Sequence, residues 1–359
     1  MRITILGVGL IGGSIGLAAR RRLDAQVVGF DPDSATLERA LELAALDQSA
    51  GSIAEACEGA ELIFCAAPVS VLPELAQEAL AACGEECVVT DVGSTKREIV
   101  ATLGQDERFI GGHPLAGAET SGVENARAEL LEGARWYLTP TTYSGGLLYD
   151  RLQRTLAELG ARPQAIDADT HDRLMATVSH LPHVIANVLV TQAASELAAG
   201  SEHLPEAGPS LRDTTRVAGA NPEIWGDIFD SNREAVAAAI DATVKRLQTA
   251  SALILEGDRE AVAGWHKRAA EDRRQLLEAE LAGGPLQQLR VGVPNRPGTV
   301  AELALALGRA GVNIEDMALS PSADMRSGAI SLWIAGEEEA ERAVELVREL
   351  GYMVSVEPG

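Results

Sequence analysis

The chain has 359 residues, and a usual size of about 100 to 200 residues per domain predicts two or three domains. Hydrophobic residues make up 46% and charged residues 23%, which excludes a disordered or fibrous protein. The formal net charge of −23 argues against nucleic acid as a partner, because nucleic-acid binding needs Lys and Arg to neutralise phosphates. An anionic ligand would therefore need a locally basic site.

The chain begins directly with a predicted strand, and no uninterrupted apolar run reaches the ~18 residues that a membrane span needs. We therefore expect no signal peptide, no membrane segment and a cytoplasmic location. Four cysteines lie in the first third of the sequence: Cys57, Cys65, Cys83 and Cys87. Cys83 and Cys87 allow a metal site or a disulfide. No second Cys/His cluster follows at zinc spacing, which favours reduced thiols.

Short apolar runs bounded by Gly, Pro and Asp alternate with helical patterns in the first part of the chain. This alternation predicts a parallel sheet covered by helices, an α/β domain over residues 1–166. The predicted strands are 3–7, 26–30, 62–66, 88–92 and 109–112. Apolar segments at 136–139 and 163–166 are expected to complete the same sheet.

The pattern then changes twice. Residues 167–282 carry long Ala-, Leu- and Val-rich stretches with helical periodicity, which predicts an all-helical domain. Gly283-Gly284-Pro285 is a predicted linker. Residues 286–359 predict a ferredoxin-like βαββαβ module. Its predicted elements are strand 289–293, helix 299–310, strands 313–319 and 329–335, helix 338–350 and strand 353–356.

Residues 7–12 read G-V-G-L-I-G, between the first predicted strand and helix. This is the G-x-G-x-x-G pattern of dinucleotide-binding folds, in which glycines permit a tight turn and a close approach of the backbone to a pyrophosphate. The helix amides then face the phosphate charge. The predicted cofactor-binding residues of this motif are Gly7, Gly9, Leu10, Ile11 and Gly12. The alternative is that the glycines serve only the strand-to-helix turn.

Asp31 ends the second predicted strand, about 20 residues after the glycines, where an acidic residue bonds the ribose hydroxyls of a dinucleotide. A carboxylate there repels a 2′-phosphate. The sequence therefore predicts NAD rather than NADP as the cofactor. The alternative role for Asp31 is a cap of the next helix.

Three further polar clusters follow predicted strand ends, where ligands of open α/β sheets bind. The first contains Pro68, which we assign to the cofactor site, the second Ser94, and the third His113 between glycines. A histidine at a strand end is often structural. On a dinucleotide-binding fold, however, it is a candidate base near the nicotinamide.

The predicted helical domain contains the polar residues Asp172, Ser179, His180 and His183. Pro182 is expected to kink this helix, because proline removes a backbone hydrogen bond. His180 and His183 lie one turn apart, which allows a metal site, a buried polar network or substrate contacts. No carboxylate accompanies them at a matching helical spacing, so we expect no metal.

Further along, R-D-T-T-R-V-A at 212–218 precedes N-P-E-I-W at 221–225. Together with G-G-H-P-L-A-G at 111–117 and V-S-H-L-P-H at 178–183, these motifs resemble the prephenate and arogenate dehydrogenase family over almost all of residues 1–281. The resemblance implies a Rossmann domain, a helical substrate and dimerisation domain, NAD as cofactor and prephenate as substrate. It also implies a homodimeric enzyme of tyrosine biosynthesis.

The same resemblance implies roles for individual residues. His113 bonds the ring hydroxyl of the substrate as the catalytic base, and Ser94 assists it. Arg216 and His183 hold a carboxylate of the substrate. In a protein with so large a negative charge, an anionic substrate needs a guanidinium for binding. Aromatisation of the ring supplies the driving force, so no metal is required. The other implied pocket residues are Asp172, Ser179, His180 and Trp225.

Two loops of the C-terminal module, 294–300 (P-N-R-P-G-T-V) and 311–314 (G-V-N-I), resemble the amino-acid-sensing ACT domain. The resemblance implies an allosteric site for an amino-acid effector, which we expect to be tyrosine. The implied effector-binding residues are Asn295, Gly298, Gly311, Asn313 and Ile314. The alternative is a ferredoxin-like dimerisation module that binds no ligand.

Three other functions stay open. Arogenate differs from prephenate in an amino group in place of a keto group, so arogenate dehydrogenase fits the same motifs. A β-hydroxyacid dehydrogenase would have the same order of a Rossmann domain and a helical domain. Resemblance to that family, however, would imply a catalytic lysine on the helix after the sheet, where this chain has histidines. A non-catalytic amino-acid sensor is expected to lose some of the predicted catalytic and substrate-binding residues, and none of these residues is missing here.

Overall fold

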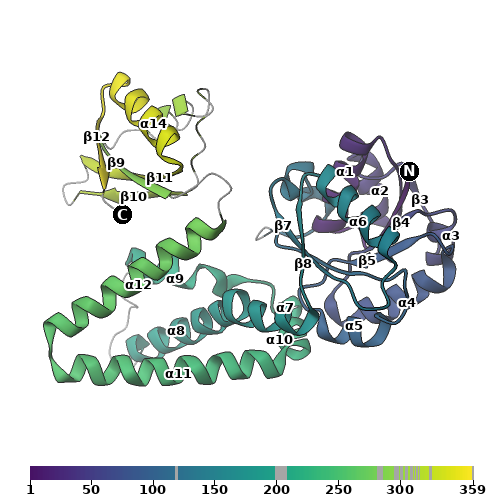
Figure 1. Cartoon of the computed structure of the whole chain (residues 1–359), viewed down its shortest axis with the longest axis horizontal. Helices are drawn as coiled ribbons and strands as arrows, with labels where there is room; N and C mark the ends of the chain where they lie inside the picture. Colours follow the sequence, from purple (N-terminus) through teal and green to yellow (C-terminus); the bar gives the residue numbers. More distant parts are fainter. Residues whose placement is uncertain are drawn as a thin grey trace. The chain divides into compact units, whose positions relative to one another are not determined.

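The computed structural model describes residues 1–357 except 118–119, 199–207, 281–285, 295–298, 300–301, 304–305, 308–309, 311, 313, 315 and 323–325. The chain divides into two compact units, Met1–Arg246 and Leu247–Gly359. In Figure 1 the first unit runs from purple to green and the second from green to yellow.

The first unit contains a five-stranded parallel sheet with the order β3-β2-β1-β4-β5. Its strands are β1 Arg2–Leu6, β2 Gln26–Phe30, β3 Gln48–Ser49, β4 Leu62–Cys65 and β5 Val88–Asp91. Successive side chains enter different cores, because a strand alternates its faces: Ile5 packs in one cluster and Leu6 in the other. The four cysteines are all free.

Helices cover this sheet, as Figure 1 shows for α1, α4, α5 and α6. The helices of this region are α1 Leu10–Leu23, α2 Ser34–Glu42, α3 Ile53–Cys57, α4 Leu72–Ala82, α5 Arg97–Leu103 and α6 Gly146–Glu158. The order of strands and helices gives the doubly wound arrangement that the sequence predicts.

The later strands form a sheet of their own, which corrects the expectation of one continuous sheet. β6 Gly111–Pro114, β7 Arg135–Thr139 and β8 Arg162–Ala165 have the order β6-β7-β8, and β7 runs antiparallel to β6. The helical turns described between β6 and β7 are short 3₁₀ segments rather than a crossover helix, so β7 returns antiparallel. A single bridge between Val89 and Phe109 links this sheet to β5.

The chain after β8 is helical. Its helices are α7 Ala168–Met175, α8 Leu181–Ala198, α9 Pro209–Thr215, α10 Pro222–Ser231, α11 Arg233–Glu256 and α12 Arg259–Glu280. The stretch Ala168–Ser195 is long and apolar enough to cross a membrane by length and composition, although one such helix is weak evidence. Only 22% of its most apolar window is buried within the described residues. Much of this apolar surface is therefore exposed in a single chain.

The C-terminal sheet is antiparallel, with the order β10-β11-β9-β12. Its elements are β9 Leu286–Pro294, β10 Asp316–Pro321, β11 Ser327–Ala335, α14 Glu337–Glu349 and β12 Met353–Glu357. Residues of α14 and the sheet share a separate hydrophobic core. The predicted linker at 283–285 and part of the predicted helix at 299–310 lie outside the described residues.

Candidate active site

A cleft of about 510 Å³ opens where β1, β2 and β4 end. Four of the predicted cofactor residues line it: Gly7, Gly9, Asp31 and Pro68. The other three, Leu10, Ile11 and Gly12, form the first turn of α1. This helix begins without a side-chain cap, which leaves its first amides available to an anion.

The three glycines of the motif meet different surroundings. Gly7 has φ +94°, and a Cβ on it would lie 2.3 Å from the carbonyl oxygen of Ala66. A Cβ on Gly12 would lie 2.1 Å from the carbonyl oxygen of Gly7, whereas a Cβ on Gly9 would meet nothing within 4 Å. Gly7 and Gly12 are therefore required by the fold. The open space at Gly9 fits a pyrophosphate that approaches the backbone.

Asp31 connects the end of β2 to the glycine loop. Its Oδ2 accepts a hydrogen bond from the amide of Val8 at 2.8 Å, and its Oδ1 accepts one from the amide of Asp33 at 3.0 Å. Asp33, rather than Asp31, caps α2. Asp31 thus lies at the edge of the cleft with its carboxylate held in place.

Two adjoining cavities in the same unit share Gly117 and Trp225. The first measures about 370 Å³ and the second about 510 Å³. The first cavity is lined by the predicted residues Ser94, His113, Ser179, His180 and Trp225. The second is lined by His183, Arg216 and again Trp225. The structure therefore brings together residues from β6, α8, α10, a π-helical turn and two loops or short turns.

Trp225 organises the wall between the two cavities. Its ring stacks on His183 with the centroids 3.4 Å apart, and it meets His180 edge-on at 5.9 Å. Burial, together with the positive charge of Arg216, lowers the pKa of His183. His183 is therefore a neutral hydrogen-bonding group beside a guanidinium, and this end of the site suits an anion.

The helix before Pro182 forms a π-helical turn, Ala176–His180, at the place where the sequence predicts a kink. The amide of Leu181 donates to the carbonyl of Ala176, five residues earlier. Proline has no amide hydrogen, and its ring crowds the carbonyl four residues before it, so a wider turn relieves the conflict. Ser179 and His180, in this turn, line the first cavity.

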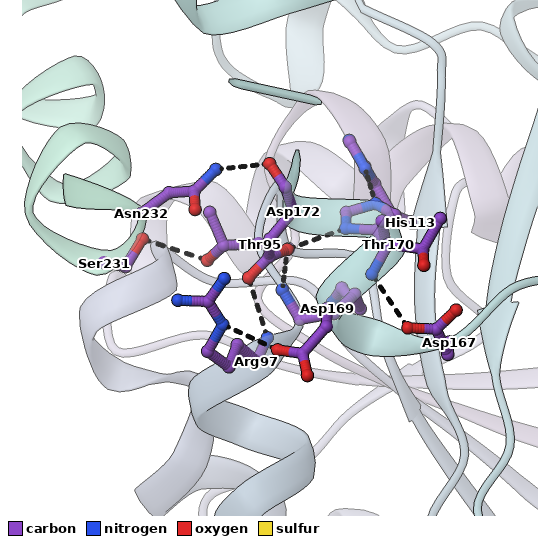
Figure 2. Close-up of polar contacts among 12 residues, drawn as sticks. Thr95, Arg97, His113, Asp167, Asp169, Thr170, Asp172, Ser231 and Asn232 are labelled. Carbon is purple, nitrogen blue, oxygen red and sulfur yellow. Dashed lines mark hydrogen bonds and ion pairs between the residues drawn. The ribbon is translucent and has the colours of Figure 1, made fainter. Parts of the chain in front are cut away.

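A buried chain of hydrogen bonds ends at His113. Its Nδ1 lies 2.9 Å from Nε2 of His171, and Nδ1 of His171 lies 2.8 Å from Oδ1 of Asp172. Figure 2 draws these contacts and shows Asp172 between His113 and Asn232. Nε2 of His113 has no hydrogen-bond partner among the described residues, and His113 lines the first cavity.

Asp172 lies beneath the pocket, which corrects the expectation that it contacts the substrate. It is fully buried and lines neither cavity. Its Oδ1 accepts from the amide of Lys96 at 2.8 Å and its Oδ2 from the amide of Arg97 at 2.9 Å. Burial opposes its ionisation, but the hydrogen bonds from His171, Arg97 and Lys96 outweigh burial and lower its pKa. Asp172 is therefore a buried carboxylate with three donors.

A second carboxylate fixes the strand ends around His113. Asp91 pairs with the buried ammonium of Lys96 and accepts hydrogen bonds from the amides of Gly93 at 2.8 Å and Gly112 at 3.0 Å. Burial lowers the pKa of Lys96, and Asp91 opposes that shift. The pair thus holds the Ser94 loop and the start of β6 together.

Electrostatics keep His113 neutral. Burial lowers its pKa well below the usual value, and the neighbouring His171, Lys96 and His180 act in the same direction. A neutral imidazole can accept a proton, so His113 has the protonation state of a general base. Among the described residues, no group of three or more His, Cys, Asp or Glu side chains could hold a metal.

Sequence reasoning missed four residues that support this site: Asp91, Lys96, His171 and Asn232. Nδ2 of Asn232 donates to the carbonyl of Asp172 at 2.8 Å and contacts Nδ1 of His180 at 3.2 Å. The available signals were the adjacent pair His171-Asp172 and a lysine in a lysine-poor chain. Neither signal identifies a partner. The predicted effector residue Ile314 packs against the C-terminal core, and Asn295, Gly298, Gly311 and Asn313 lie outside the described residues.

Comparison with known proteins covers both units. The family model for the prephenate dehydrogenase nucleotide-binding domain matches residues 15–165, that for its dimerization domain matches 167–268, and that for the ACT domain matches 287–351. A prephenate dehydrogenase of Bacillus subtilis is 29% identical over 97% of this chain and 96% of its own length. One from Lactococcus lactis is 30% identical over 85% of this chain and 86% of its own.

A solved structure agrees with these matches. Prephenate dehydrogenase from Aquifex aeolicus, in complex with hydroxyphenyl propionate and NAD⁺, superimposes with a TM-score of 0.73 and 30% identity. The likeness covers 77% of this chain and 98% of that one. These matches confirm the predicted order of a Rossmann domain, a helical domain and an ACT domain, and the chain belongs to the prephenate dehydrogenase family.

Proposed function

We propose that this chain catalyses the NAD-dependent oxidative decarboxylation of prephenate to 4-hydroxyphenylpyruvate, a step of tyrosine biosynthesis. The observation that carries the proposal is the neutral His113, whose Nε2 is available in a cavity that Ser94 also lines. The glycine cleft at the ends of β1, β2 and β4 fits the cofactor through the open space at Gly9 and the uncapped start of α1. Asp31 at its edge favours NAD over NADP.

The chemistry requires one base and no cofactor besides NAD. Prephenate has a hydroxyl on C4 and a carboxylate on C1 of a cyclohexadiene ring. The hydroxyl proton goes to Nε2 of His113 as C4 loses a hydride, and the bond between C1 and its carboxylate breaks, so that carbon dioxide leaves and the ring becomes aromatic. NAD, when bound, supplies the hydride acceptor. A base of this kind contributes about 10²- to 10⁴-fold in rate.

The second cavity suits the side-chain carboxylate of prephenate. Arg216 and His183 both line it, and the neutral His183 can share a carboxylate with the guanidinium. In a chain of net charge −23, this local positive charge gives a dianionic substrate a binding site. We assign Ser179, His180 and Trp225 to substrate contacts, since all three line the first cavity.

The composition of the two cavities favours prephenate over arogenate. Arogenate carries an ammonium where prephenate carries a keto group, and a buried ammonium needs an acceptor or a negative charge. Among the described residues that line the cavities, none is Asp or Glu. An ammonium beside Arg216 would therefore meet repulsion. A keto oxygen can accept hydrogen bonds there.

Formation of NADH, followed by absorbance, tests the proposal. We expect turnover with prephenate and NAD, and lower kcat/KM with arogenate or with NADP. Higher kcat/KM with arogenate would make this an arogenate dehydrogenase. No turnover of either substrate would contradict the assignment and favour the sensor or β-hydroxyacid alternatives.

We further propose a cytoplasmic homodimer with three domains, 1–166, 167–282 and 286–359. Residues 167–268 match a dimerization domain, and only 22% of the most apolar window in the helical stretch Ala168–Ser195 is buried in the single chain. A second copy would cover this surface, and the buried Asp172 and His171 within the stretch argue against a membrane span. Light scattering on the purified protein should give twice the chain mass. A monomer would contradict the dimer.

We propose tyrosine as the effector of the ACT domain. The reason is the match at 287–351, together with the chemistry of end-product control. Tyrosine also resembles the reaction product, so it could compete in the catalytic pocket. Truncation after Leu281 separates the two possibilities, provided that the shortened chain still oxidises prephenate. Allosteric control requires that inhibition disappear, whereas an unchanged inhibition constant would show direct competition.

A further inference from the structure

The hydrogen bonds beneath the pocket have a definite direction. Asp172 is ionised, because three donors stabilise its carboxylate, and a carboxylate only accepts hydrogen bonds. Nδ1 of His171 therefore carries a hydrogen and donates a hydrogen bond to Oδ1 of Asp172. With that single ring proton, His171 has a lone pair on Nε2.

That lone pair determines the protonation of His113. Nδ1 of His113 lies 2.9 Å from Nε2 of His171, and one of the two atoms must be the donor. Since Nε2 of His171 is the acceptor, Nδ1 of His113 carries the hydrogen. The remaining nitrogen of His113, Nε2, then has its lone pair available in the cavity.

The other histidine of this cavity receives the opposite tautomer. The carbonyl of Asp172 can only accept, so the group of Asn232 that contacts it at 2.8 Å is the amide Nδ2. The same Nδ2 contacts Nδ1 of His180 at 3.2 Å, which makes Nδ1 the acceptor. His180 therefore presents a donating Nε2–H, while His113 presents an acceptor.

We propose that His171 is a positioning residue that fixes His113 in the tautomer able to accept a proton at Nε2. In turnover, the O–H bond of the substrate breaks and an N–H bond forms at Nε2, while the Nδ1 proton of His113 stays hydrogen-bonded to His171. Asp172 remains a carboxylate and stabilises the new positive charge through His171. This catalytic part rests on the proposed function. The tautomer part does not.

Nuclear magnetic resonance of the full chain labelled with ¹⁵N-histidine tests the tautomer without substrate. The chain has only six histidines, and the His113 signals are assigned by their loss in His113→Asn. Above neutral pH we expect wild-type His113 to be protonated at Nδ1 and bare at Nε2. A proton on Nε2 of wild-type His113 would overturn the proposal, whatever the enzyme turns over.

His171→Phe removes both hydrogen bonds and keeps an aromatic ring against Tyr137, which now meets His171 edge-on with the centroids 5.6 Å apart. We expect His113 to shift towards the Nε2–H form and kcat to fall about 10²-fold or more, with KM for prephenate nearly unchanged because His171 lines no cavity. Unchanged His113 signals or an unchanged kcat would overturn the proposal.

Tyr137→Phe is the matched control, because it alters the packing neighbour of His171 but no member of the hydrogen-bond chain. It should leave the His113 tautomer and kcat as in the wild type. If His171→Phe fails to fold, His171→Gln replaces it and the wild-type tautomer still decides. If wild-type enzyme does not oxidise prephenate, the proposed function fails, whereas the tautomer measurement still tests the role of His171.

Discussion

The cofactor cleft is shaped mainly by the backbone, whereas the substrate pocket is formed by side chains. Backbone geometry shapes the cleft: Gly7 needs a positive φ, Gly12 packs against the Gly7 carbonyl, and Gly9 leaves open space. Side chains from distant parts of the chain form the pocket, and a second layer of buried polar groups holds them. A local motif can therefore specify the cleft, whereas the pocket exists only after the sheet and the helices have assembled.

The largest effect should come from the pocket. His113→Asn removes the base but keeps a polar side chain of similar size, so we expect kcat to fall by about 10²- to 10⁴-fold with little change in KM. Steady-state kinetics with prephenate measures this. An unchanged kcat would remove His113 from the mechanism. The pocket would then no longer differ from the cleft in supplying a catalytic side chain.

Arg216→Ala tests the other end of the pocket. The loss of a charge-assisted hydrogen bond worth about 1.5 to 3 kcal/mol should raise KM for prephenate roughly 10- to 150-fold. The change in kcat should be smaller, because the contact is made in both ground and transition states. If KM for prephenate stays the same while the affinity for NAD collapses, Arg216 belongs to the cofactor.

The cleft offers a matched pair of glycine substitutions. Gly7→Ala should lower the free energy of unfolding by about 1 to 3 kcal/mol or more, because its positive φ and the Ala66 carbonyl both oppose a Cβ. Gly9→Ala should leave stability within about 0.5 kcal/mol and raise KM for NAD. Urea unfolding and steady-state kinetics measure the two effects. Equal stability loss in both variants would mean that Gly9 serves the fold and not a ligand.

The smallest expected effect is that of pH near neutrality. An ordinary histidine has a pKa of about 6.5, but burial, His171 and Lys96 lower the pKa of His113. The neutral imidazole is the active form, so a lowered pKa moves the loss of kcat/KM to more acid pH. A pH profile should show kcat/KM maintained as the pH falls through 6.5. Half-loss at or above 6.5 would contradict the burial of His113.

The sequence predicted most of the fold because its signals are periodic and local. Strand 26–30 is reproduced as β2, and the glycine motif lies where the pattern places it. The separate sheet β6-β7-β8 was not predicted, because apolar runs indicate strands but not their direction or partners. Direction depends on the connections. The described residues between β6 and β7 form only short 3₁₀ segments, whereas α6 joins β7 to its parallel neighbour β8.

The site divides in the same way. Motifs predicted His113, Ser94 and Arg216, which line the cavities. The role of Asp172 was not predicted, because three of its four partners, Lys96, Arg97 and Asn232, lie 60 or more residues away in the chain. A buried carboxylate and an exposed one have the same letter in a sequence. Only the fold shows which donors surround it.

The π-helical turn Ala176–His180 makes the site sensitive to chain length as well as to residue identity. His171 and His180 are nine positions apart, and an unbroken α-helix would place them roughly 180° apart around its axis. The wider turn changes that rotation, so that one histidine contacts His113 and the other lines the same cavity. Insertion of one more residue after Thr177 would turn His180 and His183 by roughly 100° relative to His171. Such a chain would keep every functional residue, but His180 and His183 would no longer face the pocket that His113 lines.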